Sequence, residues 1–331
     1  MEKANSILRT KLMQDDIKEQ IEATYLTLGL QHYVIEKDYY VTKLLHALSD
    51  IRNDHYRLVF QGGTCLSKAH GVTQRMSEDS DFRIEELPSG KDLPRSAQRR
   101  YRRDLRKAVV EKIEEVGFEI ENKRVRDEGK FTHLEIKYAS SYEMQEEIRP
   151  YIKLDLFLAR VKTPTLHLPV TSLIQKTLGE QVQHDEKSLD CISVVETAAE
   201  KWIGLTRRIA TMKHRAYYKD ASLVRHIYDL YQIQKKQPLD HSFHQLVNQI
   251  ITIEMDKYGS HNPDYLKDPF SEIRRSFSVL AEDEWRGYWD RFVHTMVFEP
   301  NPVDYDKALE NFKNSIRTLF GLFKKKLVLF S

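Results

Sequence analysis

The sequence has few cysteines, almost no net charge and no long apolar run. Cys65 and Cys191 are the only cysteines in 331 residues, which excludes a disulfide framework and a cysteine-based zinc site. Lysine and arginine number 52 against 50 aspartates and glutamates, so the formal charge of +2 gives no global field for nucleic acid. The opening segment MEKANSILRTKLMQDD lacks the apolar core of a signal peptide, and no membrane span is visible. We therefore expect a cytoplasmic protein with no membrane partner.

The stretch from Leu58 to Ile84 carries the strongest local signal. Its apolar start predicts a buried strand, and Gly62 and Gly63 then allow backbone conformations that a Cβ atom would forbid. We expect a helix to begin at Ser67 and to place its free N–H groups beside the glycines. Such an arrangement predicts a cradle for phosphate.

Two aspartates follow the glycines. If residues 79–84 are extended, Asp79 and Asp81 project to one face and suit Mg²⁺ bound to a triphosphate. Taken alone, an Asp-x-Asp or a Gly-Gly is more often a structural turn. The order strand, Gly-Gly, helix and Asp-x-Asp favours the functional interpretation. It also requires a third carboxylate on a neighbouring strand.

Asp155 is the candidate for that third carboxylate. The segment YIKLDLFLARV predicts a strand with Lys153 and Asp155 on one side and its aliphatic residues on the other. An aspartate in so apolar a strand is costly unless it is paired or binds a metal. Upstream, residues 118–125 and 131–138 predict a hairpin with its turn at residues 126–129.

A helix predicted to begin near Ser96 has a strongly basic first half. Its cations are Arg95, Arg99, Arg100, Arg102, Arg103, Arg106 and Lys107. The cluster is either a solvated face or a contact for RNA phosphates or a triphosphate, because arginine forks match phosphate geometry. Its nearness in sequence to Asp79 and Asp81 favours the phosphate interpretation.

The remaining segments are read mostly as helices. Residues 6–50 are predicted to be helical, with Glu36, Lys37 and Asp38 as a charged first turn. Residues 164–190 read as a connection. Two further helices carry Lys201 and Asp229, which on physical grounds alone predict an interhelical ion pair. Beyond them, Trp285 and Trp289 are expected in a core, and the tail GLFKKKLVLFS is expected to dock on the body.

These segments together resemble the AbiEii/AbiGii nucleotidyltransferase toxin family over roughly residues 30 to 235. The motifs are Glu36-Lys37-Asp38-Tyr39, Gly62-Gly63-Thr64, Ser77-x-Asp79-x-Asp81, Lys153-x-Asp155, Glu200-Lys201 and Arg225-His226-x-x-Asp229. The resemblance implies an α+β chain with two domains. A DNA polymerase β-like mixed-sheet domain with N-terminal helices would span residues 1–170. An α-helical domain, residues 171–331, would contribute Lys201 and Asp229 to the cleft.

The resemblance also implies a function and its residues. It suggests the toxin of a bacterial toxin–antitoxin or phage-defence (abortive infection) system that transfers a nucleoside monophosphate from an NTP to RNA, such as the tRNA 3′ end. The RNA would contact Arg95–Lys107, and a cognate antitoxin would be a partner. The expected catalytic residues are Asp79, Asp81, Asp155, Lys201 and Asp229, the first three binding Mg²⁺, although Asp155 rests mainly on the strand argument above. The expected nucleotide-binding residues are Gly62, Gly63, Thr64, Ser77, Ser80 and Lys153.

Two other functions stay open at this point. The same cleft could transfer phosphate to a protein such as the antitoxin, with release of a nucleoside diphosphate. The fold could also serve a non-catalytic binding protein, which should tolerate loss of Asp79 and Asp81.

Overall fold

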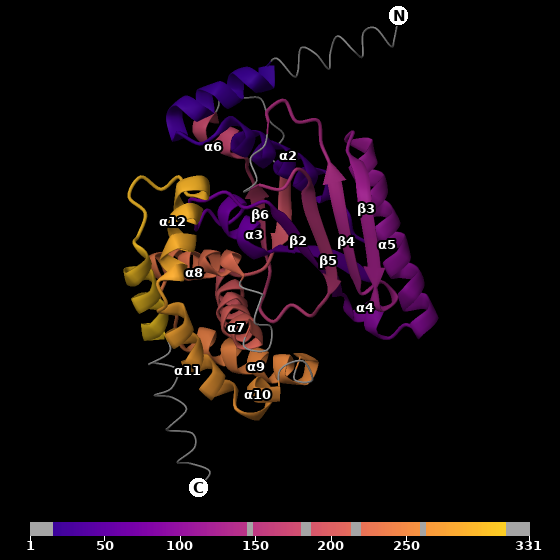
Figure 1. Cartoon of the computed structure of the whole chain (residues 1–331). Helices are drawn as coiled ribbons and strands as arrows, with labels where there is room; N and C mark the ends of the chain where they lie inside the picture. Colours follow the sequence, from indigo (N-terminus) through magenta and orange to yellow (C-terminus); the bar gives the residue numbers. More distant parts are fainter. Residues whose placement is uncertain (1–15, 144–147, 180–186, 213–219, 259–262, 316–331) are drawn as a thin grey trace, which may run out of the picture. The chain divides into compact units, whose positions relative to one another are not determined.

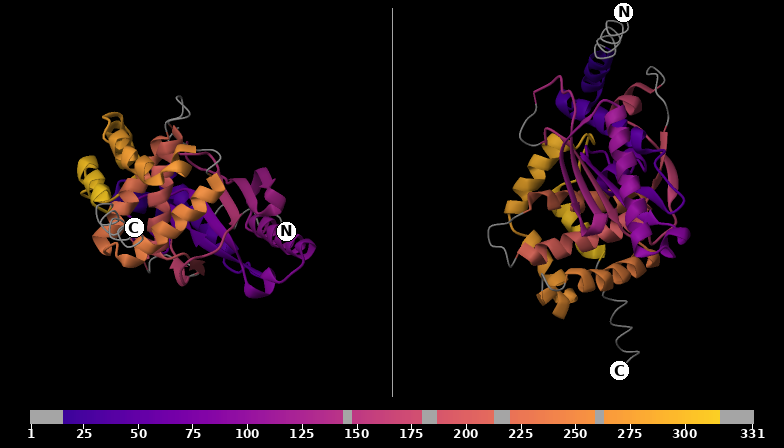
Figure 2. Two further views of the ribbon diagram at one scale, coloured as in Figure 1. Left: turned by 90° about the horizontal axis from the view of Figure 1, so that it is seen from below. Right: turned by 90° about the vertical axis from the view of Figure 1, so that its right-hand side faces the viewer.

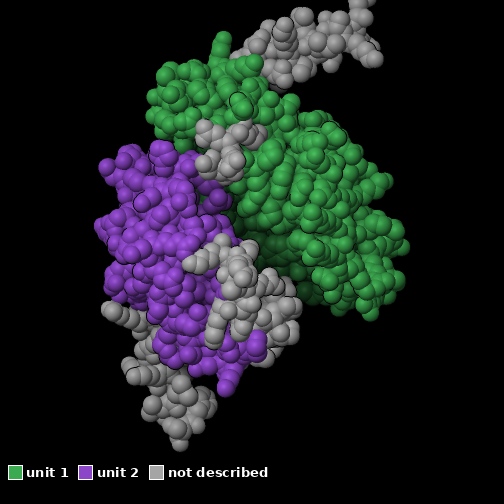
Figure 3. Space-filling model, viewed as in Figure 1, with its two compact units in different colours: residues 1–192 green, residues 193–331 purple. Residues whose placement is uncertain are grey.

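The computed structural model describes residues 16–143, 148–179, 187–212, 220–258 and 263–315. The chain forms two compact units, Met1–Ile192 (unit 1) and Ser193–Ser331 (unit 2), which are coloured separately in Figure 3. This boundary differs from the predicted one after residue 170, because the segment up to Ile192 adds a strand to the sheet of unit 1.

Unit 1 is built on a mixed sheet of seven strands within its described residues (Figure 1). The strands are β1 (Tyr56–Gln61), β2 (Asp79–Glu86), β3 (Glu119–Arg126), β4 (Phe131–Lys137), β5 (Ile152–Leu158), β6 (Leu166–Val170) and β7 (Lys187–Cys191). Their order is β3-β4-β5-β2-β1-β7-β6. The pairs β2–β5 and β1–β7 are parallel and the others antiparallel, which confirms the predicted α+β class with a mixed sheet.

Helices cover one face of this sheet. The helices of unit 1 are residues 16–28, α2 (His32–Leu48), α3 (Gly62–Lys68), α4 (Pro88–Lys91), α5 (Arg95–Glu115) and α6 (Leu173–Leu178). Helices α2 and α5 lie along the sheet (Figures 1 and 2). Their apolar stripes share one buried cluster with alternate residues of the strands, including Phe82 and Leu154. Because strand side chains alternate, the residues between these apolar ones project to the opposite face.

Most predicted strands and the basic helix are confirmed, whereas the predictions for Ser67 and for residues 164–190 are wrong. The helix expected at Ser67 begins at Gly62, whose φ of 82° allows strand β1 to turn directly into α3. Residues 164–190 contain β6, α6 and β7 rather than a simple connection. Pro169 is compatible with β6 because that strand lies at the sheet edge, where a missing N–H is tolerated.

The described residues of unit 2 form helices joined by short connections. Its helices are α7 (Val194–Met212), α8 (Val224–Lys236), α9 (His241–Tyr258), α10 (Pro263–Lys267), α11 (Pro269–Leu280), α12 (Glu284–Met296) and residues 305–315. Trp285 and Trp289 are buried, as predicted. The tail from Gly321 lies outside the described residues. None of the described helices has both the length and the hydropathy that a membrane crossing requires.

Candidate active site

Three carboxylates lie on the face of the sheet that α2 and α5 leave uncovered. Asp81 on β2 is directly opposite Asp155 on β5, and Asp79 is opposite Lys153. Asp155 is in turn opposite His133 on β4. The parallel pairing of β2 with β5 therefore brings together the three aspartates from two distant parts of the chain.

Basic side chains balance these carboxylates. The Arg149 guanidinium contacts Asp79 Oδ1 at 2.6 Å, and Lys153 Nζ lies 2.9 Å from Asp155 Oδ2 and 3.7 Å from Asp79 Oδ1. His133 Nδ1 donates to Asp155 Oδ1 at 2.6 Å. Burial opposes the charge on Lys153, but Asp79, Asp81 and Asp155 outweigh it and raise the lysine pKa. The site therefore combines several carboxylates with charged, partly exposed counter-ions.

The glycine turn lies against the same carboxylates. A Cβ atom on Gly62 would come within 2.9 Å of Asp81 Oδ2, and one on Gly63 would lie 2.4 Å from Arg75 Nη2. The Thr64 hydroxyl donates to the backbone carbonyl of Asp79 and accepts from the Ser77 hydroxyl at 2.9 Å. These contacts hold the start of α3 close to the start of β2.

Ser80 is the one predicted nucleotide-binding residue of unit 1 that lies elsewhere. Its side chain alternates with those of Asp79 and Asp81, so it projects to the helix-covered face, and it is fully buried. Ser80 is therefore not brought together with the carboxylates.

The carboxylate face suits a divalent cation by the chemistry of its donors. Within the described residues, no group of three or more metal-ligating side chains already stands close enough to hold a metal. However, Asp79, Asp81 and Asp155 are the hard oxygen donors that Mg²⁺ prefers, and they share one face. A bound cation would take over the charge balance that Arg149 and Lys153 provide.

The Glu36-Lys37-Asp38 segment is a buried polar junction, and its interpretation as a charged first turn is wrong. Helix α2 begins four residues earlier, at His32, and all three side chains are buried. Lys37 Nζ donates to Glu78 Oε2 at 2.8 Å and to the carbonyls of Arg149 and Tyr151. These bonds tie α2 to the segments immediately before β2 and β5.

Asp38 extends this junction. Its carboxylate accepts from Lys68 Nζ at 2.6 Å and from the N–H of Leu173 at 2.7 Å, so it joins α2 to α3 and α6. Glu36 accepts from the Ser140 hydroxyl and the N–H of Ser141. Every charge of the segment thus has a fixed partner on another element, which is what burial requires.

Unit 2 contains the other two predicted catalytic residues. Lys201 on α7 and Asp229 on α8 form an ion pair of 2.8 Å, with the aspartate side chain fully buried and the lysine 11% exposed. The interhelical ion pair expected on physical grounds is therefore present within unit 2.

Arg149, His133 and Lys37 were not predicted as site residues. Arg149 precedes a proline in a polar segment and has no periodic signal. His133 shares its face with Asp155 only through the β4–β5 register, which one sequence does not reveal. Its place in an alternating strand could have suggested only that it points away from the core.

A sheet that presents a glycine turn and three aspartates on one face is the site expected of a nucleotidyltransferase. The sequence profile described as "Nucleotidyl transferase AbiEii toxin, Type IV TA system" matches residues 44–311, well over half of the chain. The chain belongs to this family, and it is a nucleotidyltransferase.

Among solved structures, the chain is similar to MenT4, a nucleotidyltransferase toxin from Mycobacterium tuberculosis H37Rv. The identity is 21%, the similarity covers 68% of this chain and 76% of that one, and the TM-score is 0.38. No curated protein matches the chain.

Proposed function

We propose that the protein transfers a nucleoside monophosphate from an NTP to an RNA acceptor such as the tRNA 3′ end, with Mg²⁺ as cofactor. The observation that carries this proposal is the meeting of Asp79, Asp81 and Asp155 beside the Gly62-Gly63 turn. We also propose that the protein is a cytoplasmic toxin that a cognate antitoxin neutralises and that acts in phage defence (abortive infection). Its membership of the AbiEii family supports this role.

The three carboxylates would bind the metal, and one of them would also act as the general base. Asp79, Asp81 and Asp155 would hold Mg²⁺, which neutralises charge at the triphosphate when bound. Asp155 would also accept the proton of the acceptor hydroxyl, whose oxygen attacks the α-phosphorus while pyrophosphate leaves. His133 would keep the Asp155 carboxylate oriented, as its 2.6 Å hydrogen bond supports.

The cations would serve the phosphates. Arg149 and Lys153 already lie beside the carboxylates, and both can turn to triphosphate oxygens once the aspartates have another counter-charge. The N–H groups at the start of α3, with the Thr64 and Ser77 hydroxyls, would line the same phosphates. We further propose that Lys201 neutralises phosphate charge and that Asp229 orients it, in keeping with their short ion pair.

Label transfer tests this function. The protein would be incubated with total RNA, Mg²⁺ and each α-³²P-labelled NTP, beside Asp81→Ala and the control Glu85→Ala. Glu85 lies on the same face of β2 but pairs with Arg57. We expect label in a discrete RNA band with wild type and the control, and none with Asp81→Ala. Transfer of γ-label to the antitoxin instead, with no RNA labelling, would replace this proposal by protein phosphorylation.

A further inference from the structure

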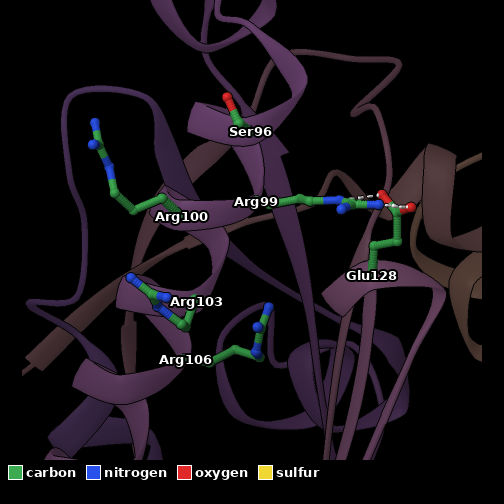
Figure 4. Close-up of a pocket in the computed structure, with 6 residues that line it drawn as sticks. All are labelled: Ser96, Arg99, Arg100, Arg103, Arg106 and Glu128. Carbon is green, nitrogen blue, oxygen red and sulfur yellow. Dashed lines mark hydrogen bonds and ion pairs between the residues drawn. The ribbon is translucent and has the colours of Figure 1, made fainter.

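The first half of helix α5 borders a hollow of about 400 Å³ whose lining is almost entirely basic (Figure 4). Its lining residues are Ser96, Arg99, Arg100, Arg103, Arg106 and Glu128. The lining therefore contains four arginines and one carboxylate, and Figure 4 shows Glu128 bonded to Arg99. The chain as a whole is nearly neutral, so this excess of positive charge is local.

The arginines of α5 separate into two groups by their contacts. Arg95 and Arg99 both bind Glu128 at the tip of the β3–β4 hairpin, and Arg102 is buried beneath the helix with its guanidinium 3.4 Å from the Tyr56 hydroxyl. These three arginines join α5 to the β3–β4 hairpin and to β1. Arg100 and Arg103 are exposed, and no carboxylate of the described residues outside α5 pairs with either.

Arg106 is held by a backbone carbonyl, and no carboxylate of the described residues forms an ion pair with it. Its guanidinium donates to the Gly129 carbonyl at 3.1 Å and occupies the space that a Cβ atom on Gly129 would need. Burial, followed by the neighbouring charges of Arg102 and Arg103, lowers the Arg106 pKa. A bound anion would stabilise such a half-buried cation, because an opposite charge offsets both the burial and the neighbouring like charges.

The position of the hollow separates it from the reacting groups. Helix α5 packs on the face of the sheet that carries Phe82 and Leu154, whereas Asp81 and Asp155 project from the other face. A ligand that reaches both must extend around the sheet, across layers that are each roughly 10 Å thick. A long anionic chain such as a nucleic acid has this reach.

We propose that Arg100, Arg103 and Arg106 form a remote phosphate site that holds the body of the RNA while its 3′ end is modified at the carboxylates. Arg100, Arg103 and Arg106 follow one another at three-residue spacing over about 9 Å of α5, and nucleic acid offers a row of charges to match them. The lining lacks the apolar anchors found at the centre of protein–protein interfaces, whereas nucleic-acid interfaces are polar and basic. This inference rests on the proposed RNA acceptor.

The test compares a long and a short acceptor. Wild type, Arg100→Gln/Arg103→Gln and the control Lys267→Gln/Lys307→Gln would be assayed with purified tRNA and with a short oligoribonucleotide of the same 3′ sequence. Both doubles remove two exposed positive charges. We expect the arginine double variant to raise the KM for tRNA about tenfold and to change the KM for the short acceptor by less than about twofold. The control double variant should change neither KM.

Direct binding makes the outcome independent of catalysis. In fluorescence anisotropy with labelled tRNA, the slope of log Kd against log salt concentration should be smaller by about one to two in the arginine double variant than in wild type. Equal losses on both acceptors, or no loss on either with an unchanged salt dependence, would overturn the inference. So would unchanged tRNA binding with lost binding of the antitoxin, which would assign the hollow to an acidic protein. If wild type binds tRNA through these arginines but labels no RNA, only the proposed reaction fails.

Discussion

Glu78 and Asp79 are adjacent in the chain and carry the same charge, yet they lie in opposite kinds of surroundings. The Glu78 side chain is 2% exposed and is held by Lys37 and by the N–H of Arg149. The Asp79 side chain is 30% exposed and faces the partly exposed side chains of Arg149 and Lys153, whereas Lys37 beside Glu78 is fully buried. An enclosed carboxylate with fixed donors joins elements of the fold, whereas an open one with exchangeable cations can take up a ligand.

Changing Asp79 should give the largest effect, and that effect should fall on activity. Asp79→Asn removes a carboxylate from the proposed metal site, where several kcal/mol of charge stabilisation are at stake. We expect transfer to fall by roughly a thousandfold, while the free energy of unfolding changes by less than about 1 kcal/mol, as for exposed ion pairs. Label transfer and urea unfolding measure the two quantities. Retained transfer in a folded variant would remove Asp79 from the site.

Changing Glu78 should affect stability instead. Glu78→Gln leaves the Lys37 ammonium buried without its counter-charge, and breaking such a pair costs about 3–5 kcal/mol. The matched control is Glu85→Gln on β2, the strand that follows Glu78, where the partly exposed pair with Arg57 should contribute less than about 1 kcal/mol. Equal losses in urea unfolding would show that enclosure does not distinguish these carboxylates.

Glu128 represents a third kind of surroundings, and changing it should have the smallest effect. The Arg99 guanidinium, with that of Arg95, lowers the pKa of Glu128 from 4.5 to about 2. A lowered carboxyl pKa gives stability that is present above about pH 4.5 and is lost as the pH falls through about 2. In urea unfolding near neutral pH, we expect the midpoint of Glu128→Gln to lie slightly below that of wild type. The difference between the two midpoints should shrink as the pH falls. A gap that stays constant from neutral to acid pH would contradict this assignment.

What the sequence predicts well is what depends on near neighbours. Alternation along residues 152–158 predicted both strand β5 and the face of Asp155, because the period of two is a local property. The basic helix followed from its apolar stripe in the same way. The nearness of α5 to Asp79 and Asp81 in the sequence does not extend to the fold, because α5 packs on the opposite face of the sheet from these aspartates.

Features that depend on distant pairing were missed. Lys37 and Glu78 are far apart in the chain, and neither has a local pattern that identifies the other as its partner. The short strand Lys187–Cys191 lacks the length for a periodic signal, and its place in the sheet comes from Phe60 opposite Cys191. Arg149 reaches Asp79 from the segment before β5, which Lys37 and Glu78 hold through the Arg149 backbone.

The position of β7 also sets the order in which the sheet can be completed during synthesis. β2 covers one side of β1 soon after β1 is made, but the other side waits for β7, near the end of unit 1. Until then a nascent chain exposes a row of unpaired N–H and C=O groups beside Val59, the arrangement that recruits other chains. Shortened chains that stop before Lys187 should therefore aggregate, and ribosome-bound chains should depend on a chaperone until Cys191 has emerged.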